Sequence, residues 1–160
     1  MSEQKKIVKE SKEKLSGDAL KNALDLIGFM EVNDIFPDDD NWFIYQGEKV
    51  CTIIFGHCEP KNMTNNGDNW SIFWSNCDVY WGENDVKDKE LEDFAHVRIN
   101  PCGKCPCENS PGIRKKIFEK VYENSCYSTL CFDNPDIKDL THIKTFVKMR
   151  KQNIIDNQRT

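Results

Sequence analysis

The fold is decided by a stretch in the first half of the chain, WFIYQGEKVCTIIF, which runs from Trp42 to Phe55. Its two ends, Trp42 to Tyr45 and Val50 to Phe55, are rich in the aromatic and β-branched residues that favour strands. The polar residues between them include Gly47 and indicate a turn. The stretch therefore predicts two strands joined as an antiparallel hairpin.

Two later stretches extend this sheet. Trp70, Ile72 and Trp74 alternate with Ser71, Phe73 and Ser75, which is the period of a strand with one strongly buried face. The segment from Cys126 to Phe132 also alternates and is predicted to be a strand. Together with the hairpin, these strands predict an antiparallel sheet rich in tryptophan.

Helices are expected on both sides of the strands in the sequence. Asp18 is a good N-cap, the apolar residues after it recur at helical spacing, and Gly28 is a plausible terminator. Asn134 followed by Pro135 predicts a second helix, with Asn134 as its N-cap. A shorter helix is expected between them, from Asp85 to Arg98. Grouped strands with helices around them indicate an α+β fold, with helices packed on the sheet and a Cys-rich loop.

The length of 160 residues is that of one domain. Residues 1–17 are rich in Lys, Glu and Ser and are expected to be a flexible N-terminal segment. Residues 18–152 are expected to form a single α+β domain, and residues 153–160 a polar tail.

The balance of charges and the absence of long apolar runs exclude several classes of partner. With 27 acidic and 22 basic side chains the net charge is −5, which argues against nucleic acid. No apolar run approaches the roughly 20 residues of a membrane span, and the N-terminus lacks the apolar core of a signal peptide. We therefore expect a cytoplasmic protein whose eight cysteines are reduced.

The strongest chemical signal is the loop Cys102-Gly-Lys-Cys105-Pro-Cys107. Two cysteines separated by two residues can direct both thiolates at one metal ion, as in tetrahedral zinc sites. Cys107 adds a third thiolate, and Cys126, after a gap of 18 residues, can close the site. The sequence predicts a structural zinc ion held by Cys102, Cys105, Cys107 and Cys126.

Other interpretations of the loop stay open. Cys102 and Cys105 are spaced like a thiol-redox pair, although no helix follows directly to lower a thiol pKa. Four cysteines can also hold an iron–sulfur cluster, or the thiols can be unligated. His57 or Cys58 can replace Cys107 as a ligand.

The remaining candidates carry weaker signals. Cys51, Cys77 and Cys131 are expected to be small core residues, and His96 and His142 to be surface or hydrogen-bonded side chains. The chain has no phosphate-binding glycine loop, dinucleotide fingerprint or zinc-protease motif. We expect a non-enzymatic module that binds a small apolar ligand or a protein on its Trp-rich sheet, with no assigned catalytic residue. The alternative is a thiol-redox or metal-dependent enzyme that uses the Cys102–Cys107 loop.

The part of the chain from Pro101 to Arg150 resembles a family of small, uncharacterised cytosolic proteins of low-GC anaerobic bacteria. The resemblance is carried by the two cysteines of the loop's C-x-x-C pair and by five short segments: Pro111-Gly112, Ile117-Phe118, Asn124-Ser125-Cys126, Phe132-x-Asn134-Pro135 and Lys148-Met149-Arg150-Lys151. A fainter likeness, in the order of helix, Trp and hairpin, is to YdhG-like domains of unknown function. The resemblance implies the α+β fold and the metal loop, and it implies no reaction.

Overall fold

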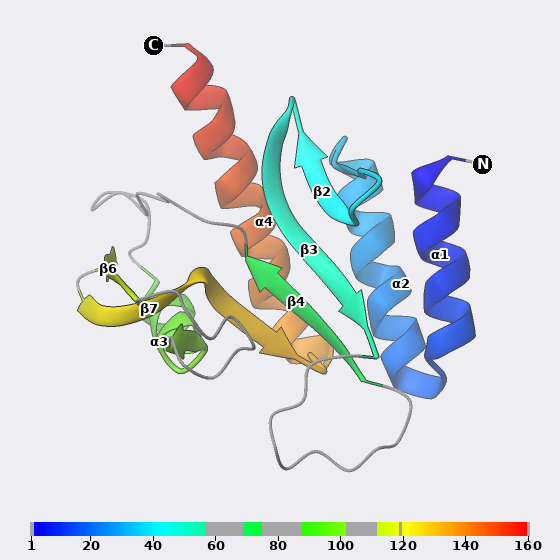
Figure 1. Ribbon diagram of the computed structural model, residues 1–160, viewed down its shortest axis with the longest axis horizontal. Coiled ribbons are helices and arrows are strands. Elements are labelled where there is room, and N and C mark those ends of the chain that lie inside the picture. Colours follow the sequence, from blue (N-terminus) through cyan, green and yellow to red (C-terminus); the bar gives the residue numbers. More distant parts are fainter. Residues whose placement is uncertain (1, 57–68, 75–87, 102–111, 119, 160) are drawn as a thin grey trace. The chain divides into compact units, whose positions relative to one another are not determined.

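The computed structural model describes residues 2–56, 69–74, 88–101, 112–118 and 120–159 (Figure 1). The contacts between Cα atoms divide the chain into two units. Unit 1 comprises Met1–Ile72 and Phe132–Thr160, and unit 2 comprises Phe73–Cys131. Strands β4 (Trp70–Trp74) and β7 (Lys120–Asp133) contribute residues to both units.

The predicted hairpin forms the centre of unit 1. Strands β1 (Phe36–Pro37), β2 (Trp42–Tyr45) and β3 (Glu48–Phe55) lie in this order and pair antiparallel. Gln46 and Gly47 both have positive φ angles, +50° and +84°. Two such residues in a row make the tight turn that suits the twist of a two-residue hairpin. The second strand therefore begins at Glu48, two residues earlier than the sequence predicted.

Three helices pack in unit 1: α1 (Glu3–Lys14), α2 (Gly17–Val32) and α4 (Ile137–Gln158). Helices α1 and α4 both contact β3, and α2 contacts α1 and α4 (Figure 1). Trp70 is buried at 1% exposure and Ile72 at 0%. The α+β fold, with helices packed on an antiparallel sheet whose strands carry Trp42, Trp70 and Trp74, is confirmed.

The two ends of the chain contain more helix than the sequence predicted. Within residues 1–17, expected to be a flexible segment, Glu3–Lys14 form α1, and its Ile7 and Ser11 are buried. Within residues 153–160, expected to be a polar tail, α4 continues to Gln158 and buries Ile154. Each helix gains its stability by packing one face, which a count of polar residues does not reveal.

The start of α4 lies two residues later than predicted. Its N-cap is Asp136, whose carboxylate accepts hydrogen bonds from the backbone N–H groups of Lys138 and Asp139. Asn134 instead bonds to β4, because its side-chain oxygen accepts the backbone N–H of Trp70 at 2.9 Å. Asn134 therefore connects the residues before α4 to β4. In the first half of the chain, Gly28 lies inside α2 and does not end it.

Unit 2 contains α3 (Lys89–His96), β5 (Ile99–Pro101) and β6 (Ile113–Ile117), together with most of β7. Strands β5 and β6 each pair antiparallel with β7. The predicted strand from Cys126 to Phe132 lies within β7. The predicted helix start at Asp85 lies outside the described residues, and the helix that is described is capped by Asp88.

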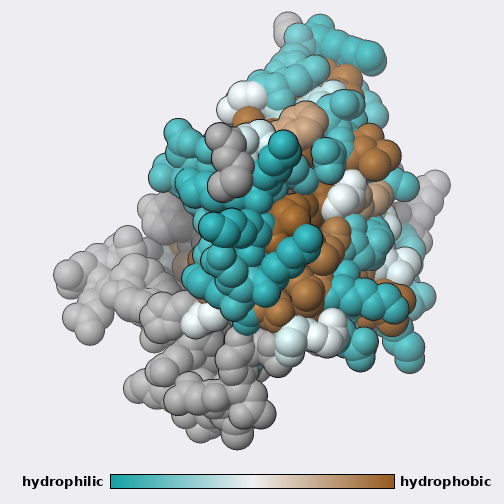
Figure 2. Space-filling model, turned by 90° about the vertical axis from the view of Figure 1, so that its right-hand side faces the viewer, coloured by the Kyte–Doolittle hydropathy of each residue, from teal (hydrophilic) through white to brown (hydrophobic). Residues whose placement is uncertain are grey.

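Figure 2 turns the α1 side of Figure 1 toward the viewer. Hydrophilic side chains cover much of this face, and hydrophobic ones are visible between them. In the described part of the chain, none of the helices has the length and apolar character needed to cross a bilayer.

Candidate functional site

Of the four predicted zinc ligands, the structure describes Cys126. It lies on β7 and is 8% exposed. Cys102, Cys105 and Cys107 lie outside the described residues, as do the alternative ligands His57 and Cys58. The described residues hold no group of three or more His, Cys, Asp or Glu side chains placed to bind a metal ion. The zinc site therefore stays a prediction.

The described strands do show where the cysteine loop begins and ends. Pro101, the last residue of β5, is the partner of Ser125 in the register of β5 with β7. Ile113, the first residue of β6, is the partner of the same Ser125. Partner residues of an antiparallel pair have Cα atoms about 4.5–5.5 Å apart. The chain therefore enters and leaves the segment between Pro101 and Ile113 beside Ser125, the neighbour of Cys126.

Ser125 is itself unusual. It is 1% exposed, and its hydroxyl has no hydrogen-bond partner among the described residues. A buried polar group without a partner costs roughly 1–3 kcal/mol. A thiolate sulfur or a bound water would accept the hydroxyl proton and remove this cost.

Among the other predicted residues, Cys51 is fully buried on β3, as expected of a core residue. Cys131 is half-buried on β7, and Cys77 lies outside the described residues. His142 lies on α4 and is half-buried. His96 has a more specific environment.

A second cluster of polar side chains is built on α3. Asp88 caps the helix by accepting hydrogen bonds from the backbone N–H groups of Glu90 and Leu91. Leu91 and Ala95 form its buried face. Glu92 and His96, four residues apart, lie one turn from each other on the same side of the helix.

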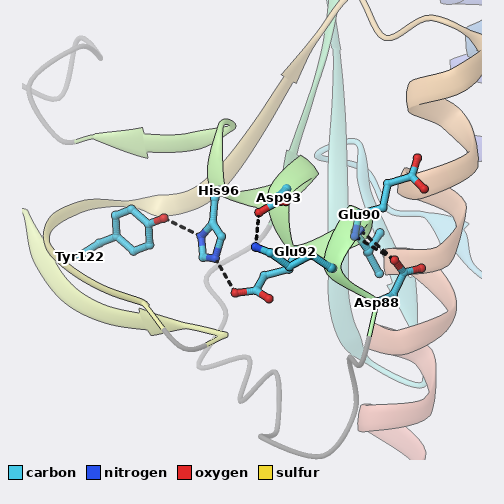
Figure 3. A network of polar contacts seen from close by, with 8 residues as sticks. Asp88, Glu90, Glu92, Asp93, His96 and Tyr122 are labelled. Carbon is cyan, nitrogen blue, oxygen red and sulfur yellow. Dashed lines mark hydrogen bonds and ion pairs between the residues drawn. The ribbon is translucent and has the colours of Figure 1, made fainter.

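Figure 3 shows that the His96 ring lies between Glu92 and Tyr122 of β7. The Tyr122 hydroxyl is 2.6 Å from His96 Nδ1, and His96 Nε2 is 3.1 Å from Glu92 Oε1. The His96 side chain is 6% exposed and that of Glu92 is 20% exposed. The ring of Phe118 packs edge-on against His96, with centroids 5.8 Å apart. We call Glu92, His96 and Tyr122 the His96 cluster.

The chemistry of these groups fixes their protons when His96 is neutral. An ionised carboxylate only accepts hydrogen bonds, so His96 Nε2 carries the proton and donates it to Glu92. Nδ1 is then an acceptor, and Tyr122 donates its hydroxyl proton to it. Burial, and next the negative charge of Glu92, raise the pKa of Tyr122 above its ordinary value of 10.0.

The raised pKa of Tyr122 predicts a loss of stability at alkaline pH. The folded protein holds the phenol proton more tightly than the unfolded chain does. The stability that the protonated Tyr122 phenol contributes to folding is therefore complete below the pKa of about 10 that Tyr122 has in the unfolded chain. It disappears as the pH rises through the higher pKa of Tyr122 in the folded protein. We expect the urea midpoint of the Tyr122→Phe variant to fall less steeply than that of the wild type above pH ~10. Parallel curves for the two proteins would contradict this assignment.

The sequence analysis did not predict the His96 cluster. The pairing of Glu92 with His96 could have been predicted, since a Glu four residues before a His on a helix is a favourable pair. Tyr122 lies 26 residues after His96, and nothing in the local pattern connects them.

No protein-family model, no curated protein and no solved structure matches this chain.

Proposed function

We propose that the protein is a non-enzymatic binding module whose Cys loop is held by a structural zinc ion on Cys102, Cys105, Cys107 and Cys126. The observation that carries the proposal is that Pro101 and Ile113, the residues on either side of the Cys loop, are both strand partners of Ser125. A loop that begins and ends beside the neighbour of Cys126 has its own cysteines within a short length of chain from that thiol.

The composition of the loop supports the same proposal. The loop has few apolar side chains to bury, and metal binding would supply the free energy that orders it.

The binding part of the proposal rests on a hollow in unit 1, where Trp42 and Ile54 are partly exposed. Charged groups of α1 border these apolar side chains, which suits a small, mainly apolar molecule with a polar end. The hollow is lined by Glu10, Lys14, Asp40, Asn41, Trp42, Thr52, Ile53, Ile54 and Phe55.

Metal analysis of two cysteine variants tests the zinc ion. Protein purified without added metal is expected to hold one zinc ion per chain, and Cys126→Ser is expected to lose it. Cys131→Ser is the matched control, because Cys131 lies on the same strand and is not a proposed ligand. It should keep the metal.

Two outcomes would overturn the zinc proposal. A metal-free protein with Cys102 in a disulfide would favour the thiol-redox enzyme. A metal-free protein in which all eight thiols react with a thiol reagent would exclude both zinc binding and a disulfide for the loop.

A further inference from the structure

The His96 cluster has the arrangement of an activated nucleophile. A hydroxyl lies within hydrogen-bond distance of a base, and the base is oriented by a third group. We propose that Tyr122 is a covalent acceptor for an acyl group, with His96 as its general base and Glu92 as the residue that positions His96.

The hydrogen bonds of the cluster allow the phenol proton of Tyr122 to move to His96. Glu92 holds the proton of His96 on Nε2, so that the lone pair of Nδ1 faces the Tyr122 hydroxyl at 2.6 Å. The raised pKa of Tyr122 means that the free phenolate is scarce near neutral pH. The phenol therefore needs a base that removes its proton as it attacks, and His96 is in that position.

The cluster is held in place by its neighbours. Phe118 lies in the turn between β6 and β7 and has the positive φ angle, +51°, that such turns use. Its ring packs edge-on against His96, and the Tyr122 ring lies tilted to the His96 ring at a centroid distance of 5.8 Å. These two ring contacts hold the His96 ring in its position beside Tyr122.

The charges around Tyr122 favour an acyl group over a phosphoryl group. Burial, and next the negative charge of Glu92, raise the pKa of the Tyr122 phenol. The Glu92 carboxylate, which lies on the other side of the His96 ring, would repel a phosphate dianion placed on the phenol oxygen. A neutral acyl group meets no such repulsion.

The step balances with an activated acyl ester as the co-reactant. Tyr122 Oη attacks the carbonyl carbon and forms a new C–O bond, while the bond from that carbon to the leaving alcohol oxygen breaks. The leaving group of the activated ester departs as a weakly basic oxyanion with the electron pair, while the phenol proton moves to His96 Nδ1 and is then released to water. Glu92 stabilises the imidazolium through its Nε2–H group.

The test treats the whole protein with p-nitrophenyl acetate near neutral pH and follows acetylation of each tyrosine by peptide mass spectrometry. We expect Tyr122 of the wild type to be acetylated at least ~10-fold faster than free N-acetyltyrosinamide, because a positioned base contributes roughly 10²–10⁴-fold. A rate at or below that of the free phenol overturns the proposal, and this comparison needs no variant.

Variants separate the roles within the cluster. His96→Gln is expected to slow acetylation of Tyr122 by about 10²-fold, and Glu92→Gln by a smaller factor. His142→Gln, which changes the histidine of α4, should leave the rate unchanged. If Tyr122 is acetylated equally fast in folded His96→Gln and in the wild type, His96 is not its base and the proposal fails.

Discussion

Removing the proposed zinc ion with a chelator is expected to expose the backbone amides of β5, β6 and the part of β7 paired with them to hydrogen exchange. Structural zinc ions contribute on the order of 10 kcal/mol to folding, more than the total stability of many small domains. The segment between Pro101 and Ile113 contains cysteine, glycine and proline and offers little apolar surface to bury. Without the metal, nothing else in its composition offsets its loss of conformational entropy.

The same treatment is expected to leave α2 and α4 protected. These helices bury large apolar side chains in unit 1, among them Leu26, Met30 and Ile143, and include no proposed ligand. Exchange is measured by mass spectrometry before and after chelation, with zinc content determined on the same samples. Adding zinc back should restore protection, and Cys126→Ser should show the chelated pattern without a chelator. Unchanged protection in protein shown to have lost its zinc would contradict a structural role.

The sheet was predictable because its signals are local. The alternation of Trp70, Ile72 and Trp74 needs only the two-residue period of a strand, and all three side chains are 0–1% exposed. The hairpin that ends at Phe55 is marked by a glycine between two strand-forming segments. In both cases, neighbours in the sequence decide the structure.

Helix α1 was missed because its buried face is not wholly apolar. Ile7 and Ser11, four residues apart on the helix, are 1% and 0% exposed, and Leu15, which follows the helix as its C-cap, is 4% exposed. Ser11 breaks the apolar pattern, but its hydroxyl donates to the backbone carbonyl of Val8 at 2.8 Å and so is satisfied when buried. On its exposed side, pairs such as Lys14 with Glu10 support the helix.

The His96 cluster could be predicted only in part. Glu92 and His96 are neighbours by helical geometry, so their pairing was readable from the sequence. Tyr122 joins them because β7 places it there, and that placement depends on tertiary structure. The zinc prediction also depends on tertiary structure, because Cys126 has a described position and the three other proposed ligands do not.

Replacing Phe146 with alanine is expected to lower the free energy of unfolding by about 3–5 kcal/mol. Phe146 lies on the buried face of α4, is 0% exposed, and its ring centroid is 6.1 Å from that of Phe132. The substitution removes the apolar area of the ring and leaves a cavity between α4 and the end of β7. Because native proteins are stable by only about 5–15 kcal/mol, this loss is a large fraction of the total.

Ile137→Ala is the matched control for Phe146→Ala. Ile137 begins the same helix but is 66% exposed, so its truncation removes little buried surface and should change stability by less than about 0.5 kcal/mol. Both variants are compared with the wild type by urea unfolding, monitored by circular dichroism. Because both substitutions place alanine in α4, helix propensity contributes little to the difference between them. Equal losses in the two variants would mean that Phe146 does not pack in the core of unit 1. A loss confined to Phe146→Ala is the expected result, because only this side chain is buried.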